Sequence, residues 1–469
     1  MYYIKNITKI LSLAFIFAFL VSSCHKVEIK PIGNTPPSEA YKSEADIKDL
    51  INSVYTILAG GNFYGGRLQK VSEYLADAAD GSGVSGYEGD IYNYKTSPNS
   101  GTQDIYNEPY LAIARSNVTL EHLDLVTSSP ATKDNYEGQA KFVRALSHFE
   151  LVKLFAQPYG YTSDNSHMGI VIKKTSAFET ARTRNSVKEV YEAIISDLND
   201  AQNLLPSTNG IYPTKWAAKG YLARVYFQMN KFDSAYKYAD QVITGSGATF
   251  DASPNFVHTR FSNPVTKEAV FFLVNESATN LRFGGLRNND DTLKSMNLPI
   301  NAATYQLGTA SSADVRKVWY KDSLYASSNS HIYSITKYKR KDFILAVLHI
   351  TELKLIRAES AASLGTNLAV AIQDINDITN RAYGGTVSPL PGTATASQVL
   401  SRVRAERRLE LVYENGDRLQ QIKRLGALGV ASVSHGNAPW NCNGIVLQFP
   451  AQEFNVNSSF VPNPTGGCL

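Results

Sequence analysis

The sequence lacks a surplus of either charge. Its 469 residues contain 46 Lys and Arg against 42 Asp and Glu. Two of the basic residues, Lys5 and Lys9, lie in an N-terminal segment that we expect to be removed, so the mature chain is near neutral. A nucleic-acid-binding face shows as a basic stripe with a high domain pI. We therefore expect no nucleic-acid partner.

Motifs for metal binding and covalent catalysis are also missing. None of the eight histidines has the H-E-x-x-H spacing, and no G-x-S-x-G nucleophile turn occurs. The run 81–86 satisfies G-x-G-x-x-G, but a dinucleotide fingerprint must follow a strand and open a helix, whereas this run leads into an expected loop. His148 stands among apolar residues and is predicted to be a packed helix residue. The sequence thus predicts no enzyme activity, no catalytic residue, no metal and no cofactor.

Asp77 and Asp80 are the nearest candidates for a pair of catalytic carboxylates. Glycoside hydrolysis requires carboxyl groups about 5 to 9.5 Å apart, a distance that sequence does not show. We favour loop hydrogen bonding, or an incidental cation contact, as the role of both residues. A secreted glycan hydrolase stays as a less favoured alternative.

No apolar run is long enough to span a membrane. The run 10–20 follows Lys5 and Lys9 and has about half of the ~20 residues that a spanning helix needs, so it predicts a signal peptide over 1–23. The sequence Val21-Ser22-Ser23-Cys24 resembles a bacterial lipobox. That resemblance implies cleavage before Cys24 and acylation of Cys24, which anchors the protein to a membrane. The alternative is an ordinary secretory signal in which Cys24 is incidental.

Only two cysteines follow Cys24. Cys442 and Cys468 either form one disulfide that holds the C-terminal tail or remain as two free thiols. The polar, Pro-containing segment 24–43 is predicted to be a tether.

Helical periodicity dominates the remaining chain, 44–469. It predicts a first helix over 44–58, helical spacing over 110–125 and 142–152, and a helix that begins at the capping box of Ser186 and Glu189. The segment 213–243 resembles a tetratricopeptide helix pair, and further pairs are expected over 350–381 and 397–425. The fold class is therefore mostly α, with helix pairs forming a frame and a few short strands.

Three segments break this periodicity: 60–107, 246–346 and 427–469. We call them the first insertion, the second insertion and the C-terminal segment. No linker separates them from the helices, so we expect 44–469 to be a single domain with long irregular loops.

Aromatic residues are abundant, with 27 Tyr and 20 Phe beside only 3 Trp. Aromatic faces suit sugar rings, which present C–H groups to a π-system. The rings in the first two insertions are the candidate ligand contacts, although each one alone is more readily explained by packing: Tyr87, Tyr92, Tyr94, Phe283, Trp319 and Tyr320.

Five stretches in this order resemble the SusD/RagB family. They are the lipobox, the helix 140–152 with the Pro158-Tyr159-Gly160 turn, the segment 184–198, the segment 353–382, and the charged run from Arg404 to Arg418. Phe449-Pro450 and Asn463-Pro464 fit the family's C-terminal signature. The charged run itself has a structural interpretation, because Arg404 and Arg408, and Glu410 and Glu414, are helical neighbours.

The resemblance implies a SusD-like α/α fold and a non-enzymatic lipoprotein at the outer membrane, facing the cell exterior. The expected role is to capture oligosaccharide or polysaccharide for uptake by a partner SusC-like TonB-dependent transporter. Capture of peptide by the same kind of system is the alternative, and a purely structural helical scaffold is another. The sequence does not identify the ligand.

Overall fold

The structure is a computed structural model of the whole chain. It describes residues 41–98, 101–177, 182–274, 286, 298–325, 330–338, 343–430 and 438–468. Contacts group Ser43–Leu469 into one compact unit, apart from Met1–Lys42. The signal peptide, Cys24 and most of the expected tether therefore lie outside the described residues. Among the helices of the described part, none combines the length and apolar character needed to cross a bilayer.

Helices make up most of the described residues, as expected. Those of the first half are α3 (Glu44–Leu58), α4 (Arg67–Leu75), α5 (Gly86–Tyr92), α6 (Gln103–Glu121), α7 (Pro130–Phe155), α8 (Val187–Leu204), α9 (Lys215–Gln228) and α10 (Phe232–Gly245). Those of the second half are α11 (Phe256–Thr259), α12 (Ala302–Thr309), α13 (Ile350–Leu364), α14 (Leu368–Tyr383), α15 (Ala396–Glu410), α16 (Asp417–Ala427) and α17 (Ala451–Val456). Short 3-10 turns occupy η1 (Leu123–Leu125), η2 (Val315–Trp319) and η3 (Asn443–Ile445).

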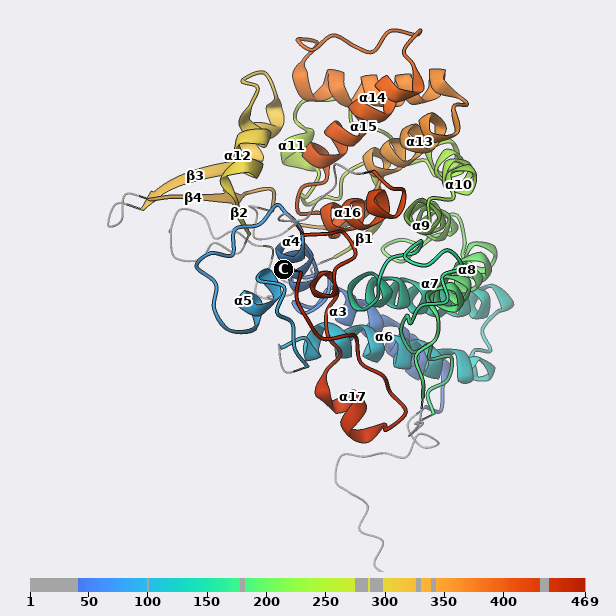
Figure 1. Cartoon of the computed structure of the whole chain (residues 1–469). Coiled ribbons are helices and arrows are strands. Elements are labelled where there is room, and N and C mark those ends of the chain that lie inside the picture. The colour runs from blue at the N-terminus through green and yellow to red at the C-terminus, as the bar shows by residue number, and fades with distance from the viewer. Residues whose placement is uncertain are drawn as a thin grey trace, which may run out of the picture. The chain divides into compact units, whose positions relative to one another are not determined.

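Consecutive helices pack side by side within residues 43–469. Helix α7 contacts α6 and α8, α9 contacts α8 and α10, and α10 contacts α13, which in turn contacts α14 and α15. Figure 1 shows this series of stacked helices, which we call the helical frame. The expected pairs α9/α10 and α13/α14 are confirmed, and the Ser186 capping box begins α8.

Two small sheets accompany the frame. Strand β1 (Ala269–Leu273) pairs antiparallel with β5 (Leu345–His349), which is buried along its length. The second sheet has the order β2 (Pro299–Ile300), β4 (Ser330–Ile335) and β3 (Tyr320–Tyr325). Figure 1 shows β3 and β4 extending away from the frame beside α12.

The first insertion is more regular than the sequence predicted. It contains α4 and α5, and α6 begins at Gln103, before the expected start. The run 81–86 therefore leads into a short helix and not into a loop. Pro109 lies inside α6 although a proline there removes a helical hydrogen bond, and the expected helix start was placed just after this proline.

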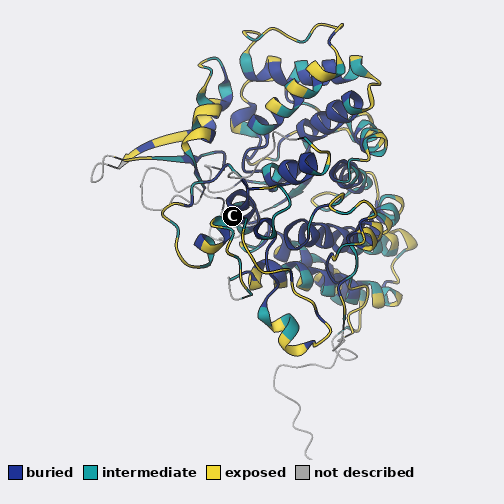
Figure 2. Ribbon diagram, viewed as in Figure 1, coloured by how far each residue is buried: buried dark blue, intermediate teal, exposed yellow. Residues whose placement is uncertain are grey.

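The interior contains charged as well as apolar side chains, and the inward faces of the frame helices are buried (Figure 2). Glu410 of α15 is 0% exposed and accepts hydrogen bonds from three guanidinium groups. These come from Arg260 after α11 at 2.7 Å, Arg316 of η2 at 3.1 Å and Arg381 of α14 at 3.0 Å. Burial acts to raise the pKa of Glu410, but the charges of Arg381, Arg260 and Arg316 outweigh it and hold the pKa well below its usual range.

Glu414 forms a second centre one turn further along the chain. Its carboxylate accepts a hydrogen bond from Lys337 Nζ at 2.6 Å and lies 2.8 Å from His349 Nε2. Arg404, Glu410 and Glu414 of the charged run are therefore structural, as expected, but their partners differ from those expected. Arg404 binds Glu359 of α13 and Glu410 binds distant arginines, so the ion pairs join separate elements and not helical neighbours.

Replacing Glu410 with Gln should lower the free energy of unfolding by about 3–5 kcal/mol at pH 7, because three buried guanidiniums lose their shared counter-charge. Urea denaturation followed by circular dichroism measures this change. Asp134→Asn, at an exposed position of α7, is the control and should change stability by less than about 0.5 kcal/mol. Equal stabilities of the two variants would contradict the account.

Candidate functional site

The first two insertions meet at the end of α4. The Asn301 backbone N–H donates to the Ala78 carbonyl at 3.0 Å, and its side chain donates to the Asp77 carbonyl at 2.7 Å. Ala79 forms an isolated antiparallel bridge with Ile300. Loop segments more than 200 residues apart in the chain are thus held together by backbone hydrogen bonds.

A pocket of about 60 Å³ lies at this junction. Its walls come from the end of α4, from α12 and β3 of the second insertion, and from α15 and α16. The residues that line it are Glu73, Ala78, Thr304, Leu307, Tyr320, Arg404, Arg407, Arg408, Leu411, Val412, Asp417, Arg418, Gln421 and Leu425.

Three side chains of this lining carry buried polar atoms that have no hydrogen-bond partner among the described residues. They are both carboxyl oxygens of Glu73, the hydroxyl of Thr304 and Nη1 of Arg407. An unsatisfied buried polar atom costs about 1–3 kcal/mol, so native structures seldom keep several together. Their convergence on one pocket indicates a place where water or a ligand completes the bonding.

Glu73 is 0% exposed. Burial first, and then the charges of Asp417 and Asp77, raise its pKa to about 8, against the opposing charges of Arg418 and Lys337. The side chain is therefore a neutral carboxylic acid at pH 7 and can donate a hydrogen bond as well as accept one.

Asp77 stands beside the pocket in a two-pronged ion pair. Arg418 Nε and Nη2 each donate to its carboxylate at 2.6 Å. Arg408 Nη2 lies farther away, 3.8 Å from the same carboxylate. Asp80 accepts the backbone N–H of Ser82 at 2.9 Å, which agrees with the loop hydrogen bonding favoured for it.

The three tyrosines of the first insertion lie in different surroundings. Tyr94 has a left-handed backbone with φ 58°, and its pKa is raised by burial and by nearby Tyr92 and Asp77. Tyr92 packs over Gly81, where a Cβ would lie 2.3 Å from the ring. Tyr87 lies under the Arg67 guanidinium, 4.6 Å from the ring centroid. None of these three tyrosines lines the pocket: Tyr92 packs within its own loop, Tyr94 lies close enough to Asp77 to sense its charge, and Tyr87 is part of a separate packing contact.

The aromatic residues predicted as ligand contacts in the second insertion also lie in different surroundings. Tyr320 begins β3 and lines the pocket. Trp319 does not face a ligand site: it is 2% exposed, its indole N–H donates to the Val257 carbonyl, and Lys337 Nζ lies 4.0 Å from the ring centroid. Trp319 is instead packed inside the protein, where Lys337, which binds Glu414, lies against its ring. Phe283 lies outside the described residues.

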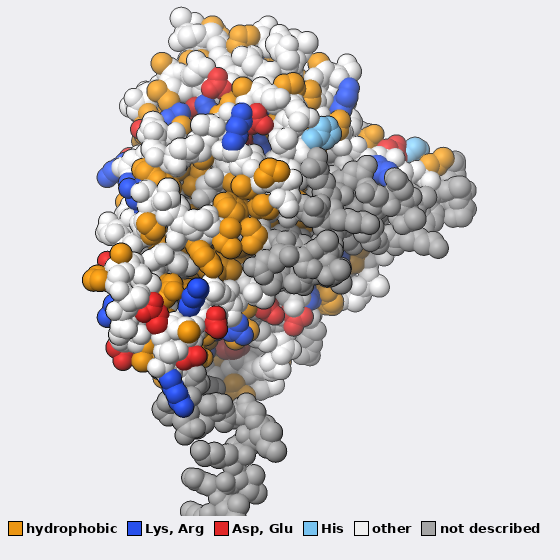
Figure 3. All heavy atoms as spheres, turned by 180° about the vertical axis from the view of Figure 1, so that it is seen from behind, with side chains coloured by type: hydrophobic (Ala, Val, Ile, Leu, Met, Phe, Trp, Pro, Cys, Tyr) orange, Lys and Arg blue, Asp and Glu red, His pale blue; other side chains and the backbone are white. Residues whose placement is uncertain are grey.

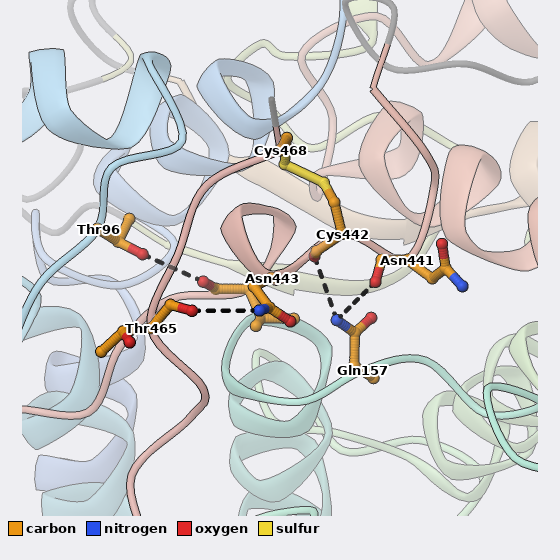
Figure 4. The surroundings of a disulfide bond; sticks show 8 residues. Thr96, Gln157, Asn441, Cys442, Asn443, Thr465 and Cys468 are labelled. Carbon is orange, nitrogen blue, oxygen red and sulfur yellow. Dashed lines mark hydrogen bonds between the residues drawn. A yellow bond between two sulfur atoms is a disulfide. The ribbon is translucent and has the colours of Figure 1, made fainter.

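Cys442 and Cys468 form a disulfide, which decides between the two alternatives for these cysteines. Figure 4 shows the hydrogen bonds around it, where the Gln157 amide donates to the carbonyls of Asn441 and Cys442. Between the disulfide and the first insertion lies Gly444, where a Cβ would be 2.5 Å from Tyr94 Cβ and 3.0 Å from Cys468 Sγ. The disulfide thus holds the C-terminal tail at Gly444, which packs against the loop that carries Tyr94.

A wider cavity of about 420 Å³ lies between α3, the segment 211–212 and the end of β1. The reverse face of the molecule also carries a patch of apolar side chains (Figure 3). The tyrosine hydroxyls in this cavity already have partners, since Tyr55 donates to Gln139 and Tyr212 donates to Asn52. No described side chain of this lining has a buried polar atom without a partner, so this cavity is a weaker candidate than the junction pocket.

Family models match two long segments of the chain. Residues 33–227 match a model described as starch-binding and associating with the outer membrane, and residues 301–438 match the model of the SusD family. The chain belongs to the SusD/RagB family. The SusD-like fold class and the family resemblance are both confirmed.

Relatives in the SusD/RagB family align over nearly the full length. SusD-like protein P2 of Formosa agariphila is 24% identical, over 94% of this chain and 96% of its own. A SusD superfamily crystal structure from Bacteroides thetaiotaomicron has a TM-score of 0.78 at 23% identity and covers 90% of this chain and 100% of its own. A structure described as a laminarin-binding SusD-like protein has a TM-score of 0.69 at 19% identity, with 90% and 100% covered. These structures share the fold.

Sequence reasoning missed Glu73, Thr304 and Arg407 as lining residues of the pocket. Glu73 and Thr304 show no local signal, because their missing partners are evident only in the folded chain. Arg404 and Arg408 had one usable signal: their spacing of four places two guanidiniums on one face of a helix.

Replacing Glu73 with Gln should change how stability depends on pH. Folded Glu73 keeps its proton up to about pH 8, whereas in the unfolded chain it loses the proton near pH 4.3. Wild-type stability therefore falls between these values as pH rises, by at most about 1.4 kcal/mol per pH unit from this group. Urea titrations at pH 5, 6.5 and 8 should show a growing advantage of the Gln variant. Parallel pH profiles would refute the neutral carboxyl.

Removal of the disulfide by Cys442→Ser with Cys468→Ser should lower the free energy of unfolding by about 2–4 kcal/mol, because the unfolded chain regains the freedom of the closed loop. Thermal and urea melts with and without reductant measure this. Reductant should destabilise the wild type and leave the variant unchanged, whereas a wild type insensitive to full reduction would argue against the role of the bond.

Proposed function

We propose that this protein is a non-enzymatic, cell-surface lipoprotein that captures an oligosaccharide or polysaccharide. It passes the glycan to a SusC-like TonB-dependent transporter in the outer membrane. Acylation at Cys24 anchors it, and the tether 24–43 lets the folded body stand off the membrane.

The observation that carries this proposal is the convergence of unpartnered polar groups on the junction pocket. A sugar offers many hydroxyls, each of which both donates and accepts a hydrogen bond. The Glu73 carboxyl, the Thr304 hydroxyl and Arg407 Nη1 supply both kinds of partner. Tyr320 and Leu307 add apolar surface for C–H groups.

The family supports the same class of ligand. One matching model is described as starch-binding, and one solved relative by fold is described as laminarin-binding. Capture needs no bond cleavage, and the ionised carboxylate beside the pocket, Asp77, is held by Arg418 through both oxygens. Weak contacts to one sugar unit add up along an extended polymer.

The test uses residues 24–469 with Cys24 replaced. Native affinity electrophoresis against neutral and acidic polysaccharides and peptides, with product analysis of the same samples, should show retention on a glycan without shorter products. Thr304→Val should weaken that retention about five- to tenfold, because it removes a hydroxyl that has no protein partner, and stability should not fall, since the unpartnered hydroxyl stabilises nothing in the free protein.

Thr119→Val is the matched control, since the Thr119 hydroxyl is buried in α6 and already donates to the Arg115 carbonyl. It should leave retention unchanged. Release of shorter sugars would contradict the non-enzymatic role, and retention by peptides alone would replace glycan with peptide as the ligand.

A further inference from the structure

Positive charge is concentrated in the lining of the junction pocket. Four guanidiniums line it, those of Arg404, Arg407, Arg408 and Arg418. Two of them have close carboxylate partners: Arg404 binds Glu359 of α13 at 3.0 Å, and Arg407 binds Asp417 of α16 at 2.6 Å. Arg418 is held by Asp77.

Arg408 is different. It forms no hydrogen bond to any described residue, and its closest counter-charge is Asp77 at 3.8 Å, which Arg418 already engages through both oxygens. Its side chain is 36% exposed, so it reaches the solvent side of the pocket. Burial and the neighbouring Arg418 charge lower its pKa, as expected for a cation whose charge is incompletely balanced.

The carboxyls of the lining do not balance this charge. Asp417 is bound by Arg407, and Glu73 keeps its proton at pH 7 because its pKa is raised to about 8. Nη1 of Arg407 is also unpartnered, but it is fully buried, and Arg407 points about 100° away from Arg408 because the two residues are consecutive on α15. Among the described residues of the lining, Arg408 thus offers guanidinium donors to an acceptor from outside the protein.

We propose that the captured glycan carries an anionic group, a carboxylate or a sulfate ester, and that Arg408 binds it. This inference rests on the proposed function and names the class of its ligand. A planar guanidinium matches both anions through paired N–H donors, and such charge-assisted bonds are stronger than those to neutral hydroxyls.

The pocket is large enough for a charged substituent of a sugar but too small for a whole sugar ring. Its volume is about 60 Å³, whereas one water requires about 10–15 Å³ on the same measure. The pocket therefore has room for a few heavy atoms. A carboxylate or sulfate would enter with a neighbouring hydroxyl, which reaches the buried polar groups, and the rest of the sugar ring would stay at the mouth.

The test compares polymers that differ in charge alone. The pairs are polygalacturonate with its methyl ester, for the carboxylate, and dextran sulfate with dextran, for the sulfate. Wild-type protein should bind the charged member of at least one pair tenfold or more tightly than the neutral member, measured by affinity electrophoresis and isothermal titration calorimetry. Added salt should weaken that binding.

Arg408→Gln should lose most of this preference, and Arg408→Lys should recover part of it. Arg402→Gln is the matched control, because Arg402 lies on α15 and does not line the pocket; it should bind like the wild type. Circular dichroism and urea melts establish that each variant is folded.

The outcomes separate the two proposals. Equal binding of charged and neutral polymers, or an anion preference that Arg408→Gln leaves intact, would overturn this inference while glycan capture stands. Absence of binding to any polysaccharide, charged or neutral, would overturn glycan capture and this inference with it.

Discussion

The buried carboxylate of Glu410 is the interaction on which the rest of the structure depends. It is shared by guanidiniums from the end of α11, from η2 and from α14, and it is 0% exposed. Buried charges are tolerated only where partners and geometry are complete, so this one contact fixes the second insertion against the helical frame. The position of β3, and hence of one wall of the junction pocket, follows from it.

Helix α15 has Glu410 on its buried face and two arginines of the pocket, Arg404 and Arg408, on another face. Glu406 and Glu410, four residues apart, face the buried arginine Arg316. Arg404 and Arg408, also four apart, line the pocket. A helix fixed by buried ion pairs on one face presents its other face in a defined position, which is what a binding site needs from its supporting residues. The disulfide between Cys442 and Cys468 supports the loop of Tyr94 in a comparable way.

Local signals predicted the helices well and the site only in part. The bounds of α3 and of α13, and the capping box of α8, follow from periodicity and capping, which act within a few residues. The partners of Glu410 could not be predicted, since Arg260 is 150 residues away in sequence and Arg316 is 94. The packing of Trp319 could not be predicted for the same reason, because Lys337 and Val257 cover it only in the folded chain. Tyr320 was named as a candidate ligand contact because it lies in an insertion. It lines the pocket because the fold brings that insertion close to α15.

The most direct test of the junction pocket as the binding site is hydrogen–deuterium exchange of the soluble protein with and without a polysaccharide that it retains. The account predicts that bound glycan slows exchange in the segments 76–82 and 411–417, which adjoin the pocket, and leaves the segments 49–56 and 211–212 of the wider cavity unchanged. Slowed exchange confined to the wider cavity, with no change at 76–82 and 411–417, would contradict it.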